Sequence, residues 1–336
     1  QPCPPWGGQN FFRHIFCISN YFVIMIKKGG NMSRVAFIFP GQGAQYVGMG
    51  QDFYEKIPVC KRVIDLAGQV AKLDLPALCF EQNDKINITE YTQIAMLGVS
   101  VAILEALKEQ GMSSCVNAGL SLGEYGALVA SGAMSMEDAF AVVRKRGIYM
   151  QEAVPTGGAM AAVLGCEAKM IEKICQETEG IVSVANYNCP GQIVITGETK
   201  AVSMAGEALK EAGARRVLPL KVSGPFHSKM LTGAGEQLKK VLEPVKIMNF
   251  DIPYVTNVTA EYVTDPSLVK SLLVQQVSSS VLWQQSVERM ISEGVDTFIE
   301  IGPGKTLTGF MRKINRNVKA VNVEKLEDLE KVVKGV

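Results

Sequence analysis

Five residues of the chain, Gly119-Leu120-Ser121-Leu122-Gly123, carry the pattern Gly-x-Ser-x-Gly. In this pattern the glycines permit a tight, strained turn between a strand and a helix, and the turn lifts the serine hydroxyl clear of the backbone. The N-terminal amides of the following helix favour an oxyanion next to that serine. We therefore predict that Ser121 is a nucleophile. The alternative is a glycine-rich connector with an inert serine.

A serine nucleophile needs a base near neutral pH, and the chain has only two histidines, His14 and His227. His227 follows the breaker-rich stretch Ser223-Gly224-Pro225. Between Ser121 and His227 the only aspartate is Asp138, which is needed to start a helix. A Ser-His dyad, with its imidazole oriented by a backbone carbonyl or amide, therefore fits more easily than an acidic triad. The alternative for His227 is a hydrogen-bonded structural residue.

A cluster of basic residues, Arg144-Lys145-Arg146, lies in a predicted helix after the serine. Adjacent charges usually form a solvated helix face, and that is what we expect for Arg144 and Lys145. Arg146 is two residues from Arg144 and points elsewhere on the helix. An inward arginine needs an anion, and its planar fork could hold a substrate carboxylate.

The overall composition excludes several classes of protein. The 336 residues include 34 Lys plus Arg and 33 Asp plus Glu, for a formal net charge of +1. Such a balance argues against a nucleic-acid surface and against a polybasic membrane patch. The eight cysteines show no Cys-x-x-Cys pair and no nearby histidine at ligand spacing, so we expect free thiols in the cytoplasm and no metal site.

The first 31 residues differ from the rest. They contain no acidic residue, and an aromatic-rich apolar run spans roughly residues 11–26. The run is short for a membrane span, which needs about 20 apolar residues. Its flanking charge also lies on the wrong side for a signal peptide. We expect Met32 to be the natural start and residues 1–31 to be an upstream or non-native leader, which leaves His227 as the one candidate base.

The body of the chain alternates strand and helix patterns, which predicts an α/β fold with a parallel sheet. We expect strands at 35–39, 115–118 and 298–301. We expect helices at 53–73, 93–110, 124–130 and 136–151, the last of them capped by Ser135, and a further helix after His227.

A different order runs through residues 155–222. The pattern predicts strands at 159–165, 181–187, 192–196 and 216–222, and helices at 168–177 and 200–211. This β-α-β-β-α-β order is that of a ferredoxin-like unit. We therefore predict a small subdomain at 155–222, inserted into a catalytic domain made of residues 32–154 and 223–336.

Five motifs, taken together and in this order, closely resemble the malonyl-CoA:acyl carrier protein transacylases of bacterial type II fatty-acid synthesis. They are Phe39-Pro40-Gly41-Gln42-Gly43-Ala44-Gln45, Gly119-Leu120-Ser121-Leu122-Gly123-Glu124-Tyr125, Arg146-Gly147-x-x-Met150-Gln151, Asn186-Tyr187-Asn188-Cys189-Pro190-Gly191-Gln192 and Glu300-Ile301-Gly302-Pro303-Gly304-Lys305. The resemblance covers Met32 to the C-terminus. It implies an α/β-hydrolase-like core, a ferredoxin-like subdomain and an active site between them.

The resemblance also implies a role for each residue of the reaction centre. Ser121 would attack the malonyl thioester of coenzyme A, and His227 would act as base, then acid, then base again for the incoming thiol. The oxyanion hole would be formed by the main-chain N–H groups of Leu122 and Gln42.

Further residues are implied around that centre. Arg146 would clamp the malonyl carboxylate, the main-chain carbonyl of Gln276 would orient the histidine, and Asn188 would line the cleft. Phe226 matches the malonyl-preferring pattern and would disfavour a branched methylmalonyl group. One residue departs from the family, because Leu120 stands where a histidine is usual.

The implied partners are malonyl-CoA and an acyl carrier protein that carries the phosphopantetheine thiol, so we expect no cofactor of the chain's own, no nucleic acid, no membrane and a monomer. The carrier is acidic, and Arg312, Lys313 and Arg316 are the candidate docking residues, with a solvated helix face as the equal alternative. Three functional alternatives stay open: an acyltransferase serving a polyketide synthase, a serine thioesterase or hydrolase, and an inert docking module.

Overall fold

The computed structural model describes residues 17–18, 21–22, 27–28, 31–222 and 224–335. Most of residues 1–31, with His14, lie outside this description, so the leader hypothesis stays a prediction. Four two-residue strands are described in this part: β1 (Cys17–Ile18) pairs with β2 (Tyr21–Phe22), and β3 (Lys27–Lys28) with β4 (Asn31–Met32).

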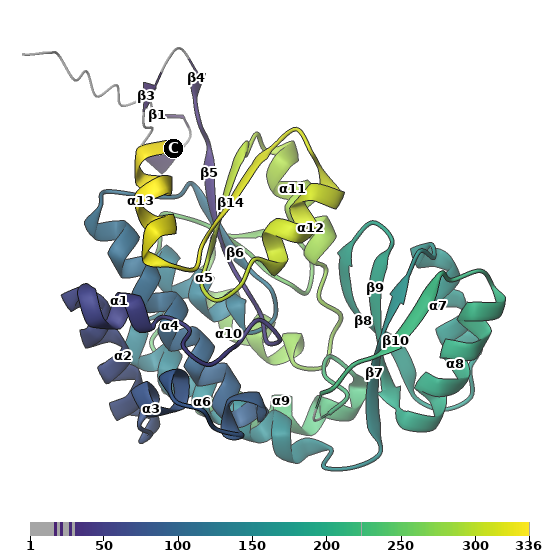
Figure 1. The fold of residues 1–336 in the computed structure, drawn as a ribbon. Coiled ribbons are helices and arrows are strands. Elements are labelled where there is room, and N and C mark those ends of the chain that lie inside the picture. Colours follow the sequence, from purple (N-terminus) through teal and green to yellow (C-terminus); the bar gives the residue numbers. More distant parts are fainter. Residues whose placement is uncertain (1–16, 19–20, 23–26, 29–30, 223, 336) are drawn as a thin grey trace, which may run out of the picture.

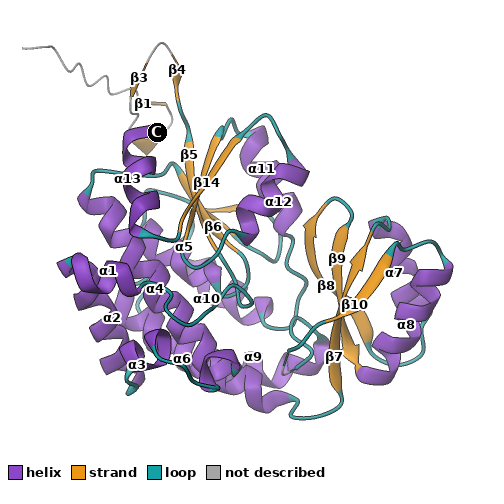
Figure 2. Ribbon diagram, viewed as in Figure 1, coloured by secondary structure: helices purple, strands orange, loops and turns teal. Residues whose placement is uncertain are grey.

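A six-stranded sheet forms the centre of the larger part of the molecule (Figure 2). Its order is β12-β11-β6-β5-β13-β14, and all neighbours are parallel except β11 and β12. The strands are β5 (Val35–Phe39), β6 (Val116–Gly119), β11 (Tyr254–Val255), β12 (Tyr262–Val263), β13 (Thr297–Ile301) and β14 (Lys319–Val323). The predicted α/β class with a parallel sheet is confirmed.

Strand β5 is buried on both faces, as expected for a central parallel strand covered by helices. Its alternate residues enter different cores. Phe37 and Phe39 belong to a core that includes helices α4 (Thr89–Glu109) and α5 (Gly123–Ser131), whereas Ala36 and Ile38 belong to a core that includes α11 (Trp283–Ser292) and α12 (Thr306–Ile314). The site is therefore held by a rigid, two-sided sheet.

Helices surround this sheet (Figure 1). They are α1 (Gln51–Lys56), α2 (Pro58–Ala71), α3 (Leu75–Phe80), α4 (Thr89–Glu109), α5 (Gly123–Ser131), α6 (Met136–Ala153), α9 (Thr232–Leu242), α10 (Pro266–Gln276), α11 (Trp283–Ser292), α12 (Thr306–Ile314) and α13 (Leu326–Gly335), with 3-10 turns η1 (Lys85–Asn87) and η2 (Lys229–Leu231). Helix α4 is long and apolar enough to cross a membrane by length and composition alone, but 83% of its apolar window is buried inside the protein. It is the central helix of the core.

A second, four-stranded sheet lies to one side of the large one (Figure 1). Its order is β10-β7-β9-β8, with every neighbouring pair antiparallel. The elements are β7 (Gly158–Leu164), α7 (Ala168–Glu177), β8 (Val182–Cys189), β9 (Gln192–Glu198), α8 (Thr199–Glu211) and β10 (Arg216–Pro219). Residues Ala161 and Val163 pack under α7 and α8, while Met160 and Ala162 face the large region.

Three predicted elements differ from the structure. The helix expected at 53–73 is two helices that separate at Ile57, because Pro58 favours a first-turn position and starts α2. The strand expected at 216–222 ends at Pro219. The helix expected after His227 begins as the 3-10 turn η2, whose N-cap Ser228 accepts a hydrogen bond from Met230 N, and becomes α-helical only at Thr232.

Candidate active site

Ser121 lies on the sharp turn between β6 and α5. Its φ of 53° places it in the left-handed region, which non-glycine residues rarely adopt. A Cβ on Gly119 would overlap the backbone of Gly123, and a Cβ on Gly123 would overlap Phe39 O. Both glycines are therefore required by close backbone approach, and the turn holds the serine hydroxyl at the carboxyl end of the sheet.

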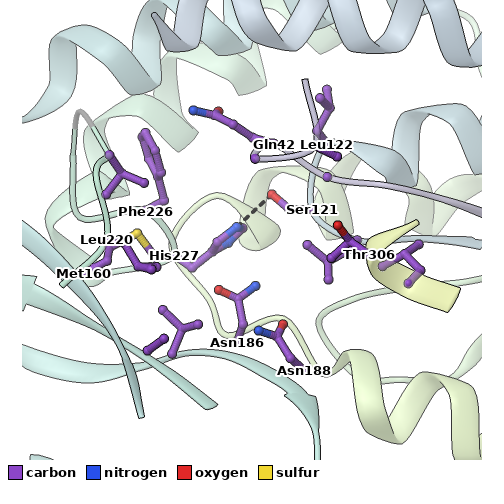
Figure 3. Close-up of a pocket in the computed structure, with 18 of the residues that line it drawn as sticks. Gln42, Ser121, Leu122, Met160, Asn186, Asn188, Leu220, Phe226, His227 and Thr306 are labelled. Atoms are coloured by element: carbon purple, nitrogen blue, oxygen red, sulfur yellow. Dashed lines mark hydrogen bonds between the residues drawn. The ribbon is translucent and has the colours of Figure 1, made fainter. Parts of the chain in front are cut away.

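His227 is the nearest base to this hydroxyl (Figure 3). Its Nε2 lies 2.8 Å from Ser121 Oγ, and its Nδ1 lies 2.9 Å from the main-chain oxygen of Gln276. A carbonyl can only accept a hydrogen bond, so Nδ1 carries the proton and Nε2 presents its lone pair to the serine. The structure thus brings together the predicted dyad and the carbonyl expected to orient it.

Burial of His227, which is only 4% exposed, lowers the pKa of its imidazole to about 4, and the nearby Arg146 charge lowers it as well. The imidazole is therefore neutral near pH 7 and able to accept a proton. Its own φ of 59° is also in the left-handed region, so both members of the dyad sit on strained backbone.

Two main-chain N–H groups flank Ser121, those of Gln42 and Leu122. Both residues line the same pocket as Ser121 (Figure 3). Within the described part of the chain, neither N–H has a hydrogen-bond acceptor. The Gln42 side chain is held away by its bond to Thr89 Oγ1 at 3.0 Å. The arrangement can bind an oxyanion formed at Ser121.

Arg146 is 1% exposed and lies behind Ser121. Its guanidinium donates to Gln93 Oε1 at 2.7 Å, to Gln276 Oε1 at 2.9 Å and to Ser121 Oγ at 3.1 Å. All three acceptors are uncharged, and the Arg146 Nε has no partner among the described residues. Burial lowers the pKa of Arg146, so a cation is held here at a cost that an anionic ligand would offset.

The prediction that Arg144 lies on a solvated helix face is wrong. Arg144 is only partly exposed because it forms an ion pair with Glu90 at 2.9 Å and lies over the ring of Tyr91. Lys145 is exposed, as expected. Leu120, the position that departs from the family pattern, lines the pocket and lies against Gly41.

A buried polar network beneath Ser121 was missed by the sequence interpretation. Asn257 Oδ1 accepts from Ser121 N at 2.6 Å, and its Nδ2 donates to Gly119 O at 2.6 Å. Glu124 Oε2 accepts from Asn257 N at 3.1 Å and from Gln276 Nε2 at 2.7 Å. Asn257 follows the two-residue strand β11, which pairs in parallel with the serine-bearing strand β6, and a strand this short leaves no signal in the sequence that could have identified the residue.

The dyad opens into a pocket of about 360 Å³ between the two sheets. Its far wall is largely apolar and comes from the four-stranded sheet and the segment that follows it (Figure 3). Asn188 and Asn186, both buried, lie on β8 in this wall. The remaining wall residues are Met160, Ala162, Gln192, Val194, Leu220, Lys221, Val222 and Phe226. A narrow, apolar arm with a polar tip fits this shape.

The basic residues proposed for docking lie on and just after α12, whose Thr306 and Phe310 line the pocket. Arg312, Lys313 and Arg316 are exposed. Lys313 Nζ donates to Gln192 Oε1 at 3.2 Å, which places it at the edge of the pocket.

Within the part of the chain that the structure describes, no group of three or more His, Cys, Asp or Glu side chains could hold a metal ion. Of the cysteines whose side chains the structure describes, six are free thiols: Cys60, Cys79, Cys115, Cys166, Cys175 and Cys189.

Comparison with known proteins gives consistent matches. The model of the acyl transferase domain matches residues 36–330. The chain is similar to the malonyl CoA-acyl carrier protein transacylase of Bacillus subtilis (strain 168), with 47% identity over 304 residues, 89% of this chain and 96% of the relative. A solved transacylase of that name from Clostridium perfringens superposes with a TM-score of 0.87 at 44% identity, covering 90% of this chain and 96% of the other.

A third match is a structure described as a type II PKS acyl-carrier protein in complex with its malonyl-transacylase. It superposes with a TM-score of 0.88 at 38% identity and covers 90% of this chain and 100% of that one.

Proposed function

The chain belongs to the acyl transferase domain family, and we propose that it moves a malonyl group from malonyl-CoA to the phosphopantetheine thiol of an acyl carrier protein. The observation that carries this proposal is the buried Arg146 guanidinium, 3.1 Å from the Ser121 hydroxyl and bound only to neutral acceptors. A malonyl carboxylate would supply an anion bound directly to the guanidinium, which has only neutral hydrogen-bond acceptors in this structure. A neutral acetyl group would leave the arginine unpaired.

The first half-reaction is acylation of the serine. Ser121 Oγ attacks the thioester carbonyl as its proton passes to His227 Nε2, and the main-chain N–H groups of Gln42 and Leu122 stabilise the negative oxygen. The imidazolium, with Nδ1–H held by the Gln276 carbonyl, then protonates the departing thiolate of coenzyme A. A malonyl-serine ester remains.

The second half-reaction runs the same steps in reverse with a new thiol. His227 removes the proton of the phosphopantetheine thiol, the thiolate attacks the ester, and Ser121 recovers its proton. Because both donors use one site in turn, ping-pong kinetics are expected. The apolar side chains of Val194 and Phe226 in the pocket wall would contact the phosphopantetheine arm, which favours a thiol acceptor over water.

We infer an α/β-hydrolase-like core made of 32–154 and 223–336, and a ferredoxin-like subdomain at 155–222. The order β10-β7-β9-β8 of the small sheet supports the second assignment. Asn188, on the subdomain, would contact the acyl donor. We further propose that the enzyme acts in the cytoplasm as a monomer and without a cofactor of its own.

The acceptor is proposed to dock at Arg312, Lys313 and Arg316, because the carrier is acidic, all three residues are exposed, and Lys313 reaches Gln192 at the edge of the pocket. Charge reversal at Arg312 and Lys313 should raise the KM for the carrier and spare that for malonyl-CoA. Equal effects on both would contradict this docking surface. Carriers of fatty-acid and of polyketide synthesis can be compared as acceptors in the same assay.

The transfer itself is tested by isolating the enzyme after reaction with labelled malonyl-CoA. The proposal expects label that persists on the protein in buffer and moves to a phosphopantetheinylated carrier when one is added. Label lost to water at the same rate with and without the carrier would instead identify a hydrolase. Ser121→Ala is the control, and it should carry no label.

A further inference from the structure

Glu124 is a fully buried carboxylate that the mechanism above does not use. One of its oxygens, Oε2, accepts from Gln276 Nε2 at 2.7 Å and from Asn257 N at 3.1 Å. The other oxygen, Oε1, is buried and has no hydrogen-bond partner among the described residues, and the Thr256 hydroxyl, itself unpartnered, lies beside this carboxylate. Burying a carboxylate that has hydrogen bonds to only one of its oxygens costs free energy, so such a residue is a candidate for a functional role.

Gln276 connects this carboxylate to the arginine of the site. A carboxylate can only accept, so the Gln276 amide must turn its nitrogen to Glu124 and its oxygen to Arg146. The observed contacts agree, since Gln276 Oε1 accepts from Arg146 Nη2 at 2.9 Å. Glu124 and Arg146 are therefore opposite charges separated by a single amide group.

Among the residues that the structure describes, no charge besides Arg146 acts on Glu124. Tyr125 on its own helix and Tyr254 on β11 face it, and burial raises the pKa of both phenols, so they are neutral. His227 is also neutral near pH 7, because burial and the positive charge of Arg146 both lower its pKa. Strands β5 and β6, packed against α5, contain no titratable side chain. Arg146 on α6 therefore stabilises the ionised form of Glu124, together with the hydrogen bonds from Gln276 and Asn257 and the neighbouring Thr256 hydroxyl.

We propose that Glu124 is the resident counter-charge of Arg146, and that binding of an acidic acyl group is coupled to uptake of one proton by Glu124. The inference rests on the proposed function, because the acidic acyl group is the malonyl carboxylate. When that carboxylate reaches Arg146, two buried carboxylates share one cation. A proton from solvent then bonds to a Glu124 oxygen, and the substrate carboxylate takes over the arginine.

Two features make this step accessible. A proton can be added at Oε1 without breaking either hydrogen bond to Oε2, and the neighbouring Thr256 hydroxyl can accept from it. Burial also raises the pKa of Glu124 to about 7 before any substrate is present. The negative charge of the substrate carboxylate would raise this pKa further, so Glu124 would take up a proton near neutral pH.

The test measures the affinity of malonyl-CoA and of acetyl-CoA for the Ser121→Ala enzyme, which binds both without turning them over. Both ligands share the coenzyme A phosphates, so the ratio of the two dissociation constants measures the contribution of the malonyl carboxylate to affinity. We expect the preference for malonyl-CoA to fall about fivefold or more between about pH 6 and pH 8, as ionised Glu124 competes for Arg146. A preference that does not change with pH overturns the inference.

Two further substitutions on this background sharpen the result. Glu124→Gln can keep an oxygen at the Oε2 position and remove only the charge, so it should bind malonyl-CoA with a preference that is independent of pH. Glu90→Gln is the matched control, because Glu90 pairs with Arg144 on the same helix as Arg146, and it should retain the pH dependence. Loss of the dependence in the control, or its survival in Glu124→Gln, would contradict the proposal.

Calorimetry of the Ser121→Ala enzyme tests the proton directly and does not depend on folding of a Glu124 variant. Titrations near pH 7 in two buffers of different ionisation enthalpy should show more protons taken up with malonyl-CoA than with acetyl-CoA. Equal uptake contradicts the inference while leaving the proposed function intact. Equal affinity for the two ligands at every pH would instead reject the proposed function.

Discussion

The two sides of the pocket are built in opposite ways. The side formed by the six-stranded sheet presents Ser121, backed by the buried polar groups of Arg146, Glu124, Asn257 and Gln276, and each of these side chains hydrogen-bonds to at least one other group of the set. The side formed by the four-stranded sheet presents mostly apolar side chains, with two buried asparagines among them.

The two sides of the pocket therefore have different roles in the reaction. Directional hydrogen bonds in a dry site hold reacting groups within a narrow geometry, and one missing partner leaves a costly unpaired group. Apolar contact is non-directional and graded, so each side chain adds a modest share of affinity. Chemistry and choice of acyl group should therefore depend on the large-sheet side, and general donor affinity on the small-sheet side.

The largest expected effect is at His227, which joins the two sides. Among the described residues, His227 is the only base in hydrogen-bond reach of the Ser121 hydroxyl, so His227→Ala should slow acylation by about 10³-fold. Rapid-quench measurement of a single turnover with malonyl-CoA gives this rate. A loss below about tenfold would mean that another group takes the proton.

A second substitution tests selectivity on the polar side. Arg146→Ala should lower kcat/KM for malonyl-CoA by about a hundredfold, because the carboxylate loses a buried charged partner. Acetyl transfer should change far less. Arg144→Ala is the control, since Arg144 pairs with Glu90 and should leave the malonyl-to-acetyl ratio unchanged. Equal losses for both acyl groups in Arg146→Ala would refute the carboxylate role.

Asn257 should affect the rate and not the affinity. Asn257→Ala removes the two side-chain hydrogen bonds that join Gly119 O to Ser121 N, so the strained turn should relax. Loss of these two buried hydrogen bonds should lower kcat about tenfold and leave KM nearly constant. Steady-state kinetics with saturating carrier separates the two constants. A rise in KM without loss of kcat would contradict a role in positioning.

The apolar side should give a smaller and less selective effect. Leu220 lines the pocket while 38% exposed, so Leu220→Ala removes only part of a buried side chain. KM should rise about two- to fourfold for malonyl-CoA and acetyl-CoA alike, with kcat unchanged. A selective effect on malonyl-CoA would break the division between the two sides.

The smallest expected effect is that of pH on the base. Because burial lowers the pKa of His227 to about 4, acylation by a neutral ester such as p-nitrophenyl acetate should change less than about twofold between about pH 7 and pH 5.5. A base with the ordinary histidine pKa of about 6.5 would lose most of its neutral form over that range. A burst rate that falls about tenfold would show an exposed imidazole.

Local patterns predicted much of this structure. The Gly-x-Ser-x-Gly turn, the helix that Ser135 caps, and the strand and helix order of the inserted region follow from glycine geometry, capping and periodicity. These signals span a few neighbouring residues, so they can be read without knowing the rest of the fold. The break at Pro58 was missed because the apolar period continues across it.

The polar network could not be predicted in the same way. Asn257 and Ser121 are 136 residues apart in the chain, and they meet because the two-residue strand β11 pairs with β6. A strand that short has no readable periodicity. The burial of Glu124 was equally hidden, since a charged residue in the first turn of a helix is normally solvated.

The most direct test of the central claim is the intact mass of the protein after mixing with malonyl-CoA, followed by mapping of the modified peptide. If Ser121 is the nucleophile, a single malonyl adduct is expected on Ser121 and none on the Ser121→Ala protein. An unmodified wild-type protein, or an adduct on any other residue, would contradict this role of Ser121.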